Sequence, residues 1–238
     1  MTAVGDVWVY LSATPLLWLT ATLLAYLAAH WLYEKAGRNP LLNPVALAVA
    51  LLIAVLLATD TDYQTYFDGA QFVHFLLGPA TVALAVPLYS NFAQVRRAVL
   101  PMFAALLAGS VTAVVSAVGV AIALGASVET VRSLAPKSVT TPIAMGIAEQ
   151  IGGLPSLTAA MVIITGILGA MTATPLLNLM RIKDWPARGF AVGVAAHGIG
   201  TARAFHVNEL AGTFAGLGMG LNALATAILV PLLLALLS

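Results

Sequence analysis

The sequence contains no cysteine and very little charge. Without cysteine, the chain can form no disulfide, no thiolate metal site and no cysteine nucleophile. Charged residues make up 8% of its 238 residues and apolar residues 61%, whereas about 25% of the residues in a soluble domain are charged. Ten Lys and Arg against nine Asp and Glu leave a net charge of +1, so no basic excess indicates a nucleic-acid partner. The composition predicts an integral membrane protein.

Short motifs typical of enzymes are also missing. We find no GxxxxGK[ST] phosphate loop, no GxGxxG, no HExxH and no GxSxG. The spacing of the four histidines indicates no metal site either. We therefore expect no catalytic reaction, no cofactor and no metal.

Long apolar runs dominate what is present. They lie at 8–33, 41–59, 72–89, 99–124, 156–180 and 209–237. Runs of this length predict membrane-spanning helices. The polar gaps are too short to fold separately, so we expect one membrane domain over 1–238, with an all-α, polytopic fold. Counting shorter elements, we expect six to eight membrane segments.

Two shorter stretches, at about 137–153 and 189–205, do not fit a simple series of crossings. Loops 34–40, 91–97 and 181–188 hold seven of the ten Lys and Arg, and positive loops favour the cytoplasm. If all three lie on that side, the first stretch returns to the outer face, and the second enters from the inside. We therefore predict that both are broken or re-entrant helices, an arrangement that recurs in transporters. On the same assumption, residues 60–68 are expected to form an acidic, aromatic connector outside, with an amphipathic surface turn as the other interpretation.

Polar residues gather at the start of the first broken element. Lys137 and Ser138 are followed by Thr140, Thr141 and Pro142. Serine and threonine favour helix N-caps, and proline favours the first helical turn, so a helix is expected to start here. Its free amides and positive dipole end, together with the lysine, would bind a carboxylate. The alternative is that the lysine simply marks the end of an ordinary membrane helix.

Glu149 lies about two turns further along the same element. If the side chain is buried, it could carry a proton at useful pH and couple transport to protons. The alternative is that it ends the helix and faces water.

The second broken element is also polar for its apolar setting. It carries His197, Gly198, Gly200, Thr201 and Arg203. The glycines permit unwound backbone, the histidine could relay protons, and the arginine offers a fork for a carboxylate. The alternatives are that the histidine only bonds a carbonyl and that the arginine reaches the membrane interface.

A third interruption lies in the run 72–89. Gly78 and Pro79 predict a helix break there, and Thr81 adds a hydroxyl that could contact substrate. A packing kink is an equally good interpretation.

Three stretches resemble the LrgB/CidB family of bacterial membrane proteins. They are PKSVTTPIA at 136–144, AAHGIGTARA at 195–204 and LLGPATVALAVPLY at 76–89, and the resemblance covers about residues 10–238. It implies a multi-pass protein of the bacterial inner membrane, in contact with lipid. It also implies a small LrgA/CidA-like membrane partner, and we expect a homo-oligomer.

The function that the resemblance implies is divided. Bacterial members are described as holin-like or antiholin-like regulators of murein hydrolase export and cell lysis. The related plant plastidal protein is a glycolate/glycerate translocator. Charged groups on broken helices are of no use to a simple lesion-forming protein. We therefore expect a secondary transporter of small monocarboxylates or 2-hydroxy acids such as glycolate, glycerate, lactate or pyruvate, coupled to protons, with the holin-like role as the alternative.

Overall fold

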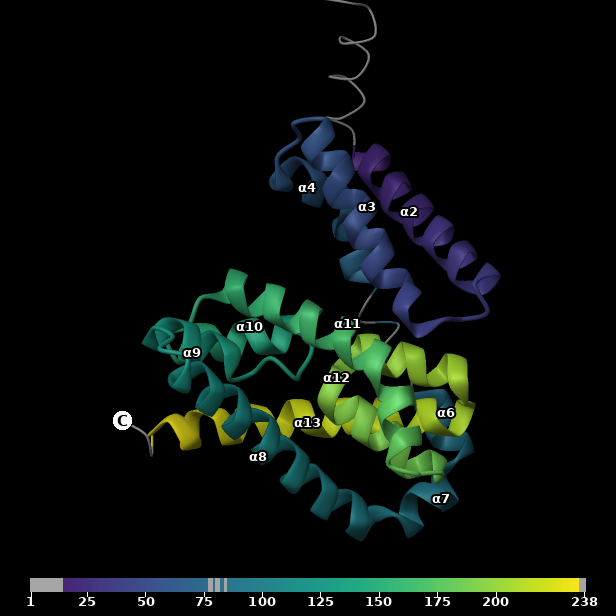
Figure 1. The fold of residues 1–238 in the computed structure, drawn as a ribbon, viewed down its shortest axis with the longest axis vertical. Helices are drawn as coiled ribbons and strands as arrows, with labels where there is room; N and C mark the ends of the chain where they lie inside the picture. The colour runs from purple at the N-terminus through teal and green to yellow at the C-terminus, as the bar shows by residue number, and fades with distance from the viewer. Residues whose placement is uncertain (1–14, 77–78, 80–81, 84, 236–238) are drawn as a thin grey trace, which may run out of the picture. The chain divides into compact units, whose positions relative to one another are not determined.

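The computed structural model describes residues 15–76, 79, 82–83 and 85–235, and Figure 1 shows its helices. Within these ranges the chain forms helices and no β-strand, which confirms the all-α prediction there. Contacts divide the chain into two compact units, Met1–Ala83 and Leu84–Ser238.

The first unit is built from short connections between apolar helices. Its elements are α2 (Pro15–Lys35), the 3-10 turn η1 (Pro40–Leu42), α3 (Pro44–Ala58) and α4 (Tyr63–Phe75). Asn43 starts α3, because its side chain accepts hydrogen bonds from the amides of Val45 and Ala46. The buried ring of Trp18 packs edge to face on Tyr66 of α4, which joins the first helix to the last.

The acidic connector expected at 60–68 is mostly helical, which corrects the sequence prediction. Asp62 accepts hydrogen bonds from the amides of Gln64 and Thr65 and so begins α4. The hydrogen bond from the Thr65 hydroxyl, followed by those from the backbone, holds the pKa of Asp62 below its usual value. The sequence analysis gave this stretch as a connector and did not identify Asp62 as a helix cap.

The second unit contains the longer helices. In chain order they are α6 (Ala85–Ser90), α7 (Phe92–Arg97), α8 (Val99–Ala123), α9 (Val128–Leu134), α10 (Thr141–Gln150), α11 (Pro155–Leu179), α12 (Trp185–Val207) and α13 (Glu209–Ala235). Helices α12 and α13 pack against each other along much of their length, and α11 packs on α12 (Figure 1). A polar cluster, described below, lies where α8, α11, α12 and α13 meet the segment before α10.

Four described helices are long and apolar enough to cross a membrane: Leu16–Lys35, Val99–Ala123, Pro155–Leu179 and Glu209–Ala235. Each coincides with one of the apolar runs in the sequence. Helix α3 has 15 residues and is about 22 Å long, shorter than the roughly 30 Å of a hydrocarbon core. Of the run expected at 72–89, residues 72–75 belong to α4 and residues 85–89 to α6.

Candidate functional site

Helix α12 is not one straight helix. Ala196 and His197 have non-helical backbone angles, and the φ of His197 is 41°. A straight helix would hold Val192 and Gly200 about 12 Å apart, yet a Cβ built on Gly200 would lie 2.9 Å from Cγ1 of Val192. The chain therefore turns back on itself at the break, and the two halves of α12 pack together. This confirms the helix break predicted within 189–205.

Close backbone packing against α13 sets the direction of the first half of α12. Gly189 lies against the carbonyl of Ala211 on α13, and Gly193 lies against the carbonyl of Ala215. From the first contact to the second, the position on α12 and the position on α13 each increase by four residues, so the first half of α12 runs parallel to α13. Glycine is needed at both positions, because any side chain would collide with a carbonyl of the neighbouring helix.

The imidazole of His197 is buried against α11. Its Nε2 lies 2.9 Å from the carbonyl oxygen of Val162, and because a carbonyl can only accept, Nε2 carries the proton. Gly166 provides the space, since a Cβ there would lie 2.5 Å from Cε1 of the ring. The hydroxyl of Thr201 donates to the carbonyl of His197 over 2.8 Å. The histidine thus makes the carbonyl contact that the sequence left as its alternative role.

The segment before α10 forms the second interruption. Helix α10 begins at Thr141, with Thr140 as N-cap residue and Pro142 in the first turn, which confirms the helix start predicted there. The hydroxyl of Thr140 makes no capping hydrogen bond. Ser138 is buried.

The two ends of this interrupted segment meet. The amide of Leu154 donates to Oγ of Ser133 over 2.7 Å, and the hydroxyl of Thr158 donates to the carbonyl of Ser133 over 3.0 Å. A Cβ on Gly153 would lie 2.9 Å from the amide nitrogen of Ser133. The chain therefore leaves this point after α9 and returns to it before α11.

Asn222 of α13 joins the two interruptions, and the sequence analysis missed it. Its Nδ2 donates to the carbonyl of Val194, at 3.0 Å, and to the carbonyl of Ser138, at 3.3 Å. Its Oδ1 accepts from the hydroxyls of Ser110, at 2.6 Å, and Thr226, at 3.3 Å. The signal that could have found it is a lone amide inside an apolar helix of 27 residues.

Two charged candidates lie apart from this cluster. Glu149 is exposed in the last turn of α10, as the alternative interpretation held, so the burial on which proton coupling by Glu149 depended is absent. Arg203 lies in the second half of α12 and lines a small cavity together with Arg188. The buried guanidinium of Arg188 donates to Oδ1 of Asn178 and to the carbonyl of Ile182.

Five further candidates are Gly78, Pro79, Thr81, Gly198 and Gly200. Gly78 and Thr81 lie outside the described residues, and Pro79 is helical and belongs to the first unit. Gly198 and Gly200 lie directly after the break in α12, with Gly200 buried where the two halves touch.

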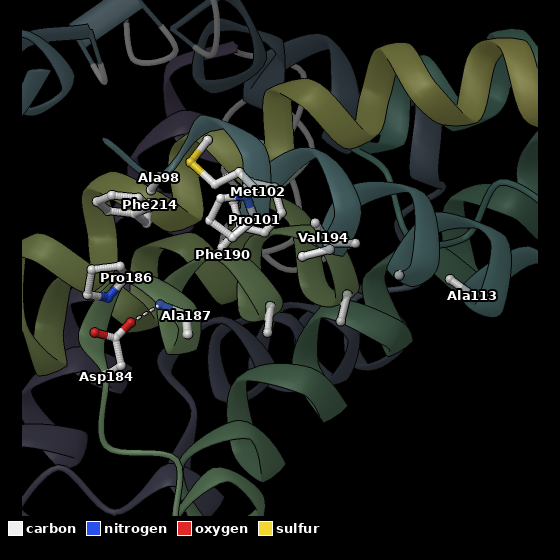
Figure 2. Close-up of a pocket in the computed structure, with 14 residues that line it drawn as sticks. Ala98, Pro101, Met102, Ala113, Asp184, Pro186, Ala187, Phe190, Val194 and Phe214 are labelled. Carbon is white, nitrogen blue, oxygen red and sulfur yellow. Dashed lines mark hydrogen bonds between the residues drawn. The ribbon is translucent and has the colours of Figure 1, made fainter. Parts of the chain in front are cut away.

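Figure 2 shows the residues that line an apolar cavity of about 390 Å³. It runs along α8 and the first half of α12, with Phe214 of α13 at one end of its lining. Asp184, drawn in Figure 2 with its hydrogen bond to the amide of Ala187, begins α12 at the edge of the cavity. Val194 belongs both to this wall and, through its carbonyl, to the polar cluster. Of the described residues that line the cavity, none is a predicted substrate ligand.

The described side chains offer no set of three or more His, Asp or Glu residues that could hold a metal ion. Long apolar helices surrounding two interrupted elements, with polar side chains buried between them, define a polytopic α-helical membrane protein. The chain belongs to the LrgB-like family, whose model matches residues 22–236.

Its relatives resemble it along nearly their whole length. The uncharacterised protein YwbG of Bacillus subtilis is 36% identical over 213 residues, which cover 90% of this chain and 94% of YwbG. The holin-like protein CidB of Staphylococcus epidermidis is 32% identical, with 94% of this chain and 97% of CidB covered. CidB of Staphylococcus aureus is 31% identical, with 92% and 95% covered. No solved structure matches the chain.

Proposed function

We propose that the chain is a secondary transporter of small monocarboxylates or 2-hydroxy acids in the bacterial inner membrane. One observation carries the proposal: a single buried amide, that of Asn222, joins the break in α12 to the segment before α10. Transporters commonly place substrate where two interrupted helices meet at membrane depth, because such breaks free polar backbone groups inside an apolar protein. No catalytic reaction is assigned to the chain.

The start of α10 supplies the features that a carboxylate requires. Lys137 brings a positive charge, and the first amides of α10 point out of its N-terminus beside Thr140 and Thr141. Ser138 is the hydroxyl donor for the 2-hydroxy group, and Thr201, whose own proton is bound to the carbonyl of His197, can accept from it. Pro142, Gly198 and Gly200 shape the backbone. His197 is the candidate for proton coupling, since it lies buried at the break in α12.

The proposal includes a membrane arrangement. The meeting of Ser133 with Leu154 supports a segment that enters the membrane and returns to the same face. The folded-back α12 supports a second such element. The four long helices, α3 and these two elements account for seven membrane segments, and the run 72–89 must be an eighth if loops 34–40 and 91–97 lie on the same side.

Uptake by purified protein in liposomes tests the proposal. With an inward proton gradient, the parent is expected to take up glycolate, lactate, glycerate or pyruvate saturably. Lys137→Ala should reduce kcat/KM by about tenfold or more, because it removes a charge-assisted contact worth about 1.5–3 kcal/mol. Lys183→Ala is the matched control, since this lysine lies exposed between α11 and α12, and it should behave as the parent.

A holin-like function is the second candidate, and the names of the holin-like CidB relatives favour it. It predicts leakage of large dyes from the same liposomes, without saturation and unchanged in Lys137→Ala. That result, with no saturable uptake of any of the four acids, would refute the transport proposal.

The partners also belong to the proposal. We expect a homo-oligomer in contact with membrane lipid, with a small LrgA/CidA-like membrane protein as a companion. Cross-linking of the protein in native membranes, followed by mass determination, separates these two kinds of partner.

A further inference from the structure

Asn222 is only 1% exposed, and both the oxygen and the nitrogen of its side-chain amide are hydrogen-bonded. Two hydroxyls, from Ser110 on α8 and Thr226 on α13, donate to Oδ1. Because carbonyls can only accept, the nitrogen of the amide must face those of Val194 and Ser138, so the amide has one orientation, with Oδ1 directed at the two hydroxyls. The side chain therefore uses its full hydrogen-bonding capacity on partners from four places in the chain.

The two carbonyls that Asn222 holds both lie next to an interruption. In a continuous helix the carbonyl of Val194 would accept the amide of Gly198, but the break at Ala196 and His197 lies between them. The carbonyl of Ser138 lies two residues before the N-cap of α10. A buried carbonyl without a donor costs about 1–3 kcal/mol, so the amide of Asn222 compensates both interruptions at once.

One nitrogen bound to both carbonyls also fixes the distance between them. Since it lies 3.0 Å from one oxygen and 3.3 Å from the other, the two oxygens lie within about 6 Å of each other. Lys137 precedes one of these carbonyl groups, and His197 follows the other by three residues. The position of the lysine relative to the break thus depends on a residue of α13 that is neither charged nor titratable.

We propose that Asn222 is the positioning residue of the substrate site, holding the segment before α10 against the break in α12 without contacting the substrate itself. Ser110 assists by fixing the orientation of the amide. The role in substrate binding rests on the proposed transport function, whereas the tethering of the two interruptions does not.

The first measurement is a distance and needs no transport. Because the chain has no cysteine, spin labels can be placed at Ile143→Cys on α10 and Ala195→Cys on α12, both exposed. Pulsed electron resonance should give one narrow distance distribution in the parent. Asn222→Asp, which replaces both donors with a carboxylate facing two carbonyls, should broaden or shift it. Asn39→Asp is the matched control, because Asn39 is an exposed cap that aspartate can replace.

The second measurement is uptake in the same liposomes. Asn222→Asp should raise KM by about tenfold or more with a smaller change in Vmax, because small misplacements of a binding group are costly. Ser110→Ala keeps the amide of Asn222 and removes only one hydroxyl. It should therefore change the distance distribution and KM in the same direction as Asn222→Asp, but to a smaller extent. If Asn222→Asp does not fold, Ser110→Ala decides the question.

The outcomes separate the two proposals. A changed distance together with a raised KM supports the positioning role. A changed distance in a protein without saturable uptake supports the tether and refutes transport. If the distance distribution is unchanged in Asn222→Asp, the tether is refuted, regardless of the uptake result. If Asn222→Asp is unfolded, an unchanged distribution in Ser110→Ala refutes it instead.

Discussion

The contact between His197 and Gly166 gives the sharpest test of the folded-back α12. An alanine methyl at position 166 would lie 2.5 Å from Cε1 and 2.8 Å from Nε2 of the imidazole, whereas carbon atoms rest about 3.5–4.0 Å apart. In Gly166→Ala the ring must retreat by about 1 Å. That movement breaks the 2.9 Å hydrogen bond between Nε2 and the carbonyl of Val162.

The expected cost follows from two effects. Overpacking costs about 1–3 kcal/mol, and a buried hydrogen bond left unmade costs about 1–3 kcal/mol more. Alanine favours a helix over glycine by about 1 kcal/mol, which offsets part of the loss. Gly166→Ala should therefore destabilise the protein by about 1–5 kcal/mol, whereas Gly119→Ala on α8, where no atom lies within 4 Å, should be neutral or stabilising.

Thermal unfolding of the two variants in the same detergent provides the assay. For a chain of this size, 1 kcal/mol moves the midpoint by about 2–4 °C. The comparison is then repeated with His197→Gly in the background, since glycine tolerates the φ of 41° at this position. Without the ring, Gly166→Ala should lose most of its cost. An equal cost with and without the imidazole would refute the assignment of the clash, and equal midpoints for Gly166→Ala and Gly119→Ala would refute the packing itself.

Three further predictions concern the membrane arrangement, the coupling and the helix packing. Single cysteines at Ala126 and Pro155 should react with an impermeant thiol reagent from the same side of the membrane, and labelling from opposite sides would show that the segment between them crosses fully. His197→Gln keeps a donor for α11 but cannot titrate, so accumulation driven by a proton gradient should be lost while substrate exchange remains. Glu149→Gln should leave both accumulation and exchange intact. If Glu149→Gln loses accumulation and His197→Gln keeps it, the coupling residue is the glutamate. Gly193→Ala brings a methyl onto a backbone carbonyl of α13 and should lower the thermal midpoint more than Gly166→Ala does, whereas an unchanged midpoint would contradict the close packing of α12 on α13.

The sequence predicted those parts of the fold that depend on local pattern. The runs at 99–124 and 156–180 end within one residue of α8 and α11, because run length and flanking polar residues fix the extent of a membrane helix. The start of α10 at Thr141 followed from threonine and proline chemistry within three residues. The break near His197 followed from the glycines around it.

The candidate site depended on distant contacts that local pattern does not contain. Asn222 binds carbonyls 84 and 28 residues away, so only its unusual polarity in α13 was visible. Sequence proximity to His197 suggested that Arg203 belongs to the same site, but the second half of α12 carries it away from the break and towards Arg188. The exposure of Glu149 was likewise decided by which face of α10 packs inward.

The tether has a consequence for biosynthesis. Synthesis proceeds from the N-terminus, so the residues of both interruptions leave the ribosome before Asn222 does. During that interval the carbonyls of Ser138 and Val194 lack the donor that holds them in the finished protein, and α13 must insert before they are paired. A chain that stopped after α12 would contain every proposed ligand of the substrate but would lack the amide that tethers the two interruptions.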